Sequence, residues 1–254
     1  MKITDFLTNS KWQSTYYMLL YGNINSVDSD YYEILGAQYK FDPVTDHVMS
    51  NNSSLFDIKK AAKMYFWYQS GNRRDTSIVD YFDEYKKCID NSHAEFNSNY
   101  GYYAYNMNGL RLCINRLLEN KESRQACFCI NNNAAMSDNS IDKLCTNVIQ
   151  FFIRDNKLKM IVQMRSSNFI TLLPYDAFMF SVFYMQVYKS LKKKYADLKT
   201  DYVYMQVASL HFYKSCVDKI KQSDLLLPRR IIDFNTEDCQ EKLEEFLTNK
   251  LTKL

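Results

Sequence analysis

Two apolar runs separated by a short polar turn form the clearest pattern along the chain. Residues 148–153 and 158–162 are rich in apolar side chains, and residues 154–157 (RDNK) lie between them. Strand-forming runs joined by an Asp-Asn turn are typical of a β-hairpin. Antiparallel pairing brings the start of the first strand beside the end of the second. We therefore expect Cys145 and Arg165, which flank the two runs, to lie in one pocket.

A thiol beside a cation is the arrangement that lowers the pKa of a cysteine and makes it a nucleophile. We therefore expect Arg165 to lower the pKa of Cys145. Taken alone, a cysteine of this kind is more often a buried structural thiol. The assignment as a nucleophile thus depends on partners elsewhere in the chain.

The spacing of apolar residues predicts the remaining elements. Helices are predicted at residues 1–22, 55–68 (capped by Ser53-Ser54), 78–89, 108–118, 174–194, 212–221 and 237–251, and strands at 31–41, 126–130 and 202–210. Strands and helices without regular βαβ alternation predict an α+β fold. We expect residues 1–254 to form one domain, with a mixed or antiparallel twisted sheet covered by helices on one face.

The charge and the cysteine content of the chain limit the cellular compartment and the binding partners that we expect. The chain has 254 residues, a net charge of +3 and one short basic run, residues 192–194, so no nucleic-acid partner is expected. An odd number of cysteines, seven, without framework spacing predicts reduced thiols in the cytoplasm. Cys127 and Cys129 lack zinc spacing, and we expect both to pack in the core; no metal site is predicted. No apolar run is long enough for a membrane span, and no signal peptide is recognised.

Three further motifs complete a constellation around Cys145 and Arg165. Asp176 lies in LLPYDAF, eleven residues after Arg165, and the sequences SLHFY and NSNYG supply a histidine, His211, and two tyrosines, Tyr213 and Tyr100. A cysteine before a strand, an Arg-Ser pair, an Asn or Asp eleven residues after that arginine and a later His-x-Tyr resemble the thymidylate synthase superfamily. The chain is most similar to the phage deoxycytidylate hydroxymethylase branch of that family. The resemblance implies a thymidylate synthase-like fold and a homodimer.

The resemblance also implies a mechanism. Cys145 would add to carbon 6 of a pyrimidine 5′-nucleotide, and carbon 5 would then attack the one-carbon unit of 5,10-methylenetetrahydrofolate. The product would be a hydroxymethyl or a methyl nucleotide, most simply hydroxymethyl-dCMP. The resemblance implies that Arg165, Ser166 and the partner subunit's copy of Arg124 bind the 5′-phosphate, and that His211 and Tyr213 bind the sugar. It also implies that Tyr100 and Asn168 contact the substrate, and that Trp67 and Asn168 contact the folate.

Asp176 bears on the choice of base. An amide side chain matches the N–H donor and carbonyl acceptor of uracil. A protonated carboxyl group can donate to the bare N3 of cytosine and accept from its amino group. Asp176 therefore favours cytosine over uracil. The alternative is an aspartate that merely complements the positive end of a helix.

Two departures from the family leave alternatives open. Met64 stands three residues before Trp67, where the family has a glutamate that organises protons around the base, and Gln125 follows Arg124 where the family has a second arginine. The chain could therefore be a catalytically impaired homologue kept for nucleotide binding or assembly. It could also act on a different pyrimidine nucleotide, such as CMP or dUMP.

Overall fold

Five strands among the described residues form one mixed sheet. The computed structural model describes residues 30–46, 56–89, 95–131, 141–216, 233 and 236–252. The strands lie in the order β1 (Tyr31–Phe41), β5 (Lys199–Tyr213), β4 (Lys157–Asn168), β3 (Thr146–Arg154) and β2 (Cys127–Cys129). β4 and β5 are parallel, and every other pair is antiparallel. The predicted α+β fold with a mixed sheet is confirmed.

The hairpin between β3 and β4 forms as predicted. Asp155 and Asn156 both have positive φ, 52° and 57°, which suits a two-residue turn that matches the twist of the strands. Arg154 pairs with Lys157 across the turn. β4 is longer than its apolar run, so Arg165 lies within the strand and not past its end.

β5 is also longer than predicted. His211 and Tyr213 belong to the strand, because β1 continues to pair with β5 as far as Tyr31 opposite Tyr213. The helix predicted at residues 212–221 is therefore wrong in its described part: two strand residues are followed by a short 3₁₀ turn, Lys214–Cys216. The remainder of that range lies outside the described residues.

The described helices follow the apolar periodicity closely. The α-helices are α3 (Ile58–Ser70), α4 (Asp83–Lys86), α5 (Gly109–Glu119), α7 (Leu173–Lys192) and α9 (Cys239–Thr252), with a 3₁₀ turn at Thr76–Asp80 and a π-helical turn at Tyr102–Asn106. α3 begins after Asp57, whose side chain accepts a hydrogen bond from the amide of Lys59. The predicted Ser53-Ser54 cap and the predicted helix 1–22 lie outside the described residues. The single helix predicted at 78–89 is instead split between the 3₁₀ turn and α4.

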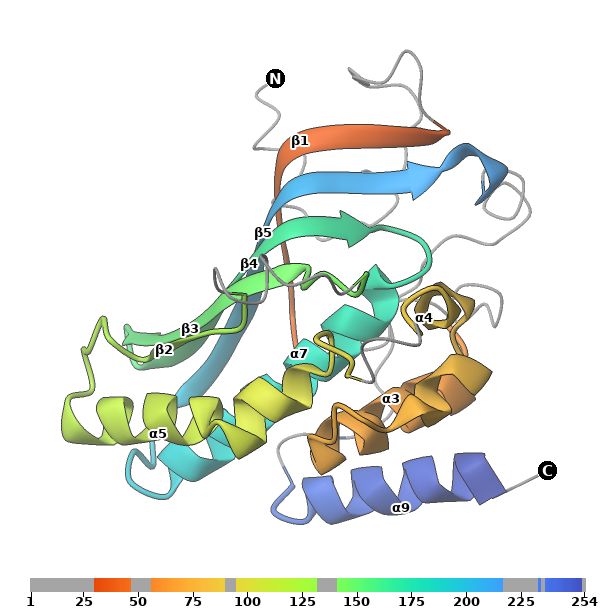
Figure 1. Cartoon of the computed structure of the whole chain (residues 1–254). Helices are drawn as coiled ribbons and strands as arrows, with labels where there is room; N and C mark the ends of the chain where they lie inside the picture. The colour runs from red at the N-terminus through yellow and green to blue at the C-terminus, as the bar shows by residue number, and fades with distance from the viewer. Residues whose placement is uncertain are drawn as a thin grey trace.

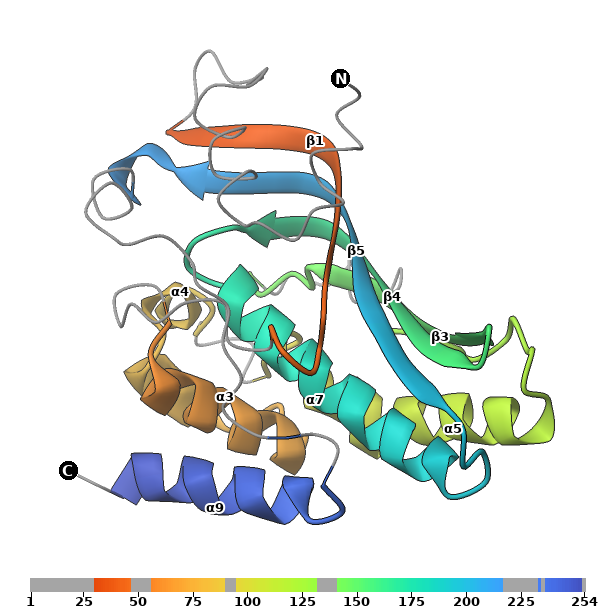
Figure 2. The same cartoon turned by 180° about the vertical axis from the view of Figure 1, so that it is seen from behind.

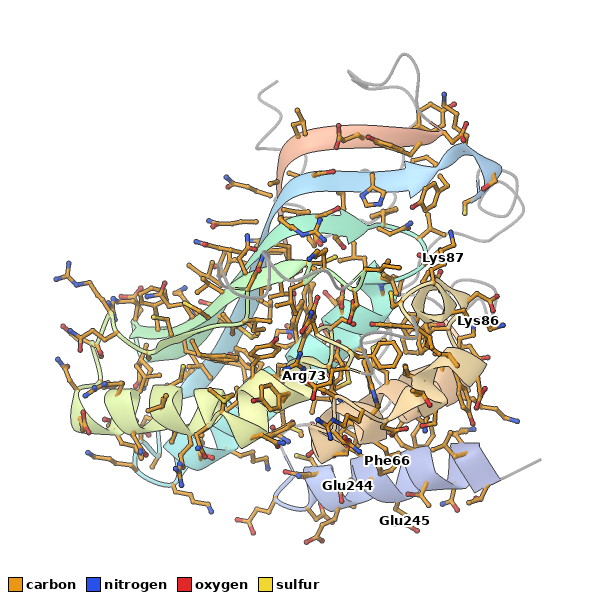
Figure 3. All side chains as sticks on the ribbon, viewed as in Figure 1. Phe66, Arg73, Lys86, Lys87, Glu244 and Glu245 are labelled. Carbon is orange, nitrogen blue, oxygen red and sulfur yellow. The ribbon has the colours of Figure 1, made fainter. Side chains whose placement is uncertain are left out.

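α7, α3 and α5 lie on one side of the sheet, with α9 beyond α3 (Figures 1 and 2). α7 is buried along nearly its whole length, which explains its apolar sequence. α9 packs on α3, where the hydroxyl of Tyr65 donates to Glu244, one of the residues labelled in Figure 3. No helix within the described ranges is both long and apolar enough to cross a membrane.

The opposite face of the sheet carries no described helix (Figures 1 and 2). Cys127 and Cys129 lie on this face and are exposed, whereas Phe128 between them is buried. The prediction that both cysteines share one face is confirmed, but the prediction that they pack in the core is wrong. β2 is an edge strand, and only the tertiary arrangement decides which of its faces meets the helices.

Gly101, which directly follows Tyr100, packs closely against the end of α3. A Cβ atom on Gly101 would lie 1.7 Å from the carbonyl oxygen of Tyr68, so only glycine permits this approach. The close contact holds residues 97–100 against the end of α3. These residues form one wall of the cavity described below.

Candidate active site

A cavity of about 210 Å³ opens where the ends of β4 and β5 meet the start of α7. It is lined by residues from α4, the loop around Tyr100, the segment before β3, and these strand and helix ends: Glu84, Tyr85, Cys88, Ser98, Tyr100, Asp142, Lys143, Cys145, Ser166, Ser167, Asn168, Thr171, Leu172, Asp176, His211 and Tyr213. Seven of the ten residues predicted from the sequence as site residues line this one cavity. Segments far apart in the chain therefore meet at one place.

Cys145 lies just before β3, and its thiol faces the guanidinium group of Arg165 on β4. Nη2 of Arg165 is 3.9 Å from the sulfur. The same guanidinium donates from Nε to the carbonyl oxygen of Leu144 at 2.7 Å and from Nη2 to that of Lys143 at 3.0 Å. Arg165 therefore holds the segment that carries the thiol, and the proximity predicted from the hairpin is confirmed.

Arg165 favours the thiolate of Cys145, as predicted, but the net pKa of Cys145 is raised and not lowered. Burial raises the pKa of Cys145 to about 11, because desolvation disfavours the thiolate. The positive charge of Arg165 acts in the opposite direction but does not outweigh burial, and negative charge on Asp176 or Asp142 raises the pKa further. Attack by Cys145 therefore requires that its proton be removed as the carbon–sulfur bond forms.

Asp176 lies in the first turn of α7 and is only 8% exposed. Burial raises the pKa of its carboxyl group to about 8. The group is therefore mostly protonated at neutral pH, and it can both donate and accept a hydrogen bond. A solvated aspartate that only complements a helix end would not be buried in this way, so the structure disfavours that alternative.

Ser166 and His211 come from the parallel pair β4 and β5. The hydroxyl oxygen of Ser166 lies 3.3 Å from Nδ1 of His211. Burial lowers the pKa of His211, so the imidazole is mostly neutral at pH 7. The ring of Tyr213 meets that of His211 edge-on at 5.9 Å and is 46% exposed, at the outer rim of the cavity.

Some polar groups in the remaining cavity wall are hydrogen-bonded within the protein, and two are not. The hydroxyl of Tyr100 accepts a hydrogen bond from the amide of Thr146 at 3.2 Å. The side-chain oxygen of Asn168 accepts from the amides of Ile170 and Thr171, both at 3.0 Å. The buried hydroxyls of Ser167 and Thr171 lack a hydrogen-bond partner among the described residues. Buried polar groups are normally satisfied, so these two hydroxyls are exceptions in the cavity wall.

Comparison with known proteins identifies the family of the chain. The thymidylate synthase family model matches residues 27–251. The chain belongs to the thymidylate synthase family. Deoxycytidylate 5-hydroxymethyltransferases of Enterobacteria phages T4, T2 and T6 are each 27% identical to it over 111 residues. That match covers 41% of this chain and spans less than half, 45%, of each relative.

Three predicted site residues of this thymidylate synthase family member do not line the cavity. Arg165 lies behind the segment that carries the thiol, so the expectation that it lines one pocket with Cys145 is wrong, although the two side chains are close. Trp67 is 1% exposed, and its indole N–H donates to the carbonyl oxygen of Asp75, so it belongs to the core. Arg124 lies before β2, where its carbonyl oxygen accepts from the side chain of Gln150. A contact of Arg124 with a second subunit stays a prediction.

Several cavity residues of this family member were not singled out from the sequence. Asp142 is 5% exposed, and its Oδ2 accepts hydrogen bonds from the amide and the hydroxyl of Ser98, both at 2.8 Å. Lys143, Tyr85, Glu84 and Cys88 also line the cavity. Asp142 and Lys143 directly precede the Leu144-Cys145 pair. Their position beside the predicted nucleophile could have identified them as site residues from the sequence. Ser98 lies within the same NSNYG motif as Tyr100.

Proposed function

We propose that this chain is a folate-dependent hydroxymethyltransferase that acts on a pyrimidine 5′-nucleotide, with dCMP as its substrate and hydroxymethyl-dCMP as its product. The observation that carries the proposal is the pairing of Cys145 with a buried, mostly protonated Asp176 in one cavity. The first supplies a nucleophile for carbon 6 of the ring. The second supplies the hydrogen-bond pattern of cytosine.

Base recognition follows from the protonation state of Asp176. A neutral carboxyl group donates its O–H to N3 of cytosine and accepts from the exocyclic amino group through its other oxygen. Uracil presents a donor at N3 and an acceptor at carbon 4, so it would need the carboxyl proton on the other oxygen. With the proton held on the oxygen that suits cytosine, uracil would leave polar groups unpaired. An unpaired buried polar group costs roughly 1–3 kcal/mol. The cavity thus discriminates against dUMP.

Covalent catalysis follows from Cys145. Its sulfur bonds to carbon 6, its proton is released, and the electron pair of the ring double bond moves to carbon 5. Carbon 5 would then bond to the one-carbon unit of methylenetetrahydrofolate as one carbon–nitrogen bond of the folate breaks. Loss of the carbon 5 proton and cleavage of the second carbon–nitrogen bond would release tetrahydrofolate and leave an exocyclic methylene at carbon 5. Arg165, 3.9 Å from the sulfur, stabilises the thiolate both on its formation and on its departure.

The rest of the nucleotide would extend toward the ends of β4 and β5. Ser166 would hold the 5′-phosphate, and Lys143, which also lines the cavity, would add positive charge there. A contact of Arg165 with the phosphate stays a prediction, because Arg165 does not line the cavity. His211 and Tyr213 would contact the sugar. A cavity of about 210 Å³ is smaller than the ~300–1,000 Å³ typical of pockets for drug-sized ligands, so folate would lie across its mouth, near Asn168.

A homodimer is part of the proposal. The face of the sheet that carries no described helix includes half-buried apolar side chains such as Val148, Phe152 and Ile161. Packing two such faces together would bury this surface. Arg124 lies beside Gln150 of the same face and would reach the partner subunit's phosphate site. All seven cysteines are free thiols, which suits a reducing compartment such as the cytoplasm.

Tritium release tests the proposal directly. With dCMP labelled at carbon 5 and methylenetetrahydrofolate, we expect tritium in water and an equal amount of hydroxymethyl-dCMP. dUMP, assayed side by side, is expected to react at least ~10-fold more slowly, because ~1–3 kcal/mol of unpaired polar groups corresponds to about that factor or more. CMP is assayed beside it to test the requirement for deoxyribose. A protein that binds dCMP but releases no tritium would be the impaired homologue, and one that prefers CMP or dUMP would have a different substrate.

Met64→Glu distinguishes an impaired homologue from a working, altered site. Met64 is 1% exposed on α3 and does not line the cavity, so a glutamate there would bury a carboxylate. We expect the free energy of unfolding to fall by several kcal/mol and activity to fall with it. Urea denaturation and the tritium assay measure both.

The matched control is Met64→Leu, which conserves volume and is expected to cost less than ~1.5 kcal/mol. A large gain of activity in Met64→Glu would instead show that the wild-type chain lacks a carboxylate that it needs.

A further inference from the structure

Three carboxyl groups line the cavity, and the mechanism above uses only one of them. Asp176 reads the base. Glu84 lies on α4 and is exposed, so its charge is well solvated. Asp142 is 5% exposed, lies three residues before Cys145 and has no role so far. It is the one buried carboxyl group of the cavity that remains to be explained.

The surroundings of Asp142 fix its orientation. Oδ2 accepts from both the amide and the hydroxyl of Ser98 at 2.8 Å. The backbone carbonyl of Asp142 accepts from the side-chain amide of Asn97 at 3.1 Å. Ser98 is in turn hydrogen-bonded to Tyr85, another cavity residue. These contacts hold the carboxyl group rigidly against the cavity wall.

The electrostatics suit a base. Burial raises the pKa of Asp142, while the hydrogen bonds from Ser98 and the positive charge of Arg73, labelled in Figure 3, favour its ionised form. Asp142 and Cys145 line the same cavity, and negative charge on Asp142 raises the pKa of the Cys145 thiol. A desolvated carboxylate is a stronger base than a solvated one, and such tuning is common at catalytic positions.

We propose that Asp142 is the general base for the water molecule that completes the hydroxymethyl group, a role that rests on the function proposed above. After folate leaves, the ring carries an exocyclic methylene at carbon 5 and the Cys145 sulfur at carbon 6. The water oxygen bonds to the methylene carbon, and Asp142 takes a proton from that water. The methylene electron pair forms the double bond between carbons 5 and 6, and the carbon–sulfur bond breaks to release the thiolate.

Met64 stands on α3 where the family has a glutamate, so α3 supplies no carboxylate to the site. Asp142, from the segment before β3, would supply one instead. It also accounts for a hydroxymethyl and not a methyl product, because a base beside the methylene favours water over hydride transfer. Asp142→Asn is the decisive variant. Its amide oxygen can still accept both hydrogen bonds from Ser98, so the wall keeps its shape while the base is lost.

We expect Asp142→Asn to form hydroxymethyl-dCMP about 10²–10⁴-fold more slowly than the wild type. The dissociation constant for dCMP should stay within about threefold, and tritium release should fall much less than product formation. Because the methylene then persists, added 2-mercaptoethanol should trap it as a thioether at carbon 5, detectable by mass spectrometry. Asp75→Asn is the matched control, because Asp75 accepts from the amide and hydroxyl of Ser77 in the same way but lies outside the cavity.

Two results would overturn the role of Asp142 alone: hydroxymethyl formation at the wild-type rate in Asp142→Asn, or an equal loss of nucleotide binding, tritium release and product, which would show a structural role. Absence of tritium release from the wild-type protein would overturn the proposed function and this inference with it.

Discussion

Replacement of Cys145 by serine is expected to lower the rate of tritium release from carbon 5 of dCMP by at least ~10³-fold, as removal of a catalytic nucleophile commonly does. A serine hydroxyl is a much weaker nucleophile than a thiol, and Arg165 at 3.9 Å is positioned to stabilise a thiolate. Binding of dCMP should change less than about threefold, because the variant keeps the shape of the cavity. Steady-state kinetics and calorimetric titration separate these two effects.

A covalent trap makes the same test independent of turnover. With 5-fluoro-dCMP and methylenetetrahydrofolate, carbon 5 cannot lose a proton, so the adduct with the wild-type enzyme should accumulate and add the mass of both ligands. Cys145→Ser should form no adduct. Cys88→Ser is the control, because Cys88 is the other thiol that lines the cavity and has no assigned role. An adduct in Cys145→Ser, or its loss only in Cys88→Ser, would contradict the assignment.

Asp176→Asn is expected to reverse the base preference from dCMP to dUMP. The amide accepts from N3–H of uracil and donates to its carbonyl, but it cannot satisfy both N3 and the amino group of cytosine in the same orientation. Affinity for dCMP should fall roughly 10- to 100-fold, corresponding to about 1–3 kcal/mol for mismatched buried groups. Competition binding with the two nucleotides measures the change.

The pH dependence of dCMP affinity provides a second test of the role of Asp176. Its pKa in the folded protein is about 8, so wild-type affinity for dCMP should decrease as the pH rises through 8 and the O–H donor is lost. The Asp176→Asn variant should show no such decrease. Asp201→Asn, which alters a carboxylate that is paired with Lys159 away from the cavity, is expected to behave like the wild type. Wild-type affinity that stays constant between pH 7 and 9 would contradict the proposed donor.

The free energy of unfolding should also decrease as the pH rises. The pKa of Asp176 is raised from 3.8 to about 8, so its contribution to stability is fully present below pH 3.8 and is lost as the pH rises through 8. Each pKa unit corresponds to ~1.4 kcal/mol. Asp176→Asn should therefore be more stable than the wild type by up to several kcal/mol at pH 9, and this difference should shrink toward pH 4. Urea denaturation at both pH values measures it.

Local sequence patterns determined the main elements of this protein. Alternating and apolar runs predict β1, the hairpin and α7, because backbone periodicity and turn preferences act over a few residues. The hairpin also placed Cys145 beside Arg165, since antiparallel pairing leaves little choice of register once the turn is known. Asp176 and His211 were found through their place in a family pattern.

The tertiary structure decided what depends on contacts between distant segments. β5 extends through His211 and Tyr213 because β1 pairs with it, and Cys127 faces outward because the helices cover the other side of the sheet. The pKa of Cys145 rises because burial outweighs a neighbouring cation, a balance that no spacing of residues reveals. Asp142 meets Ser98 across 44 positions of sequence, and only the folded chain brings these two residues to the cavity.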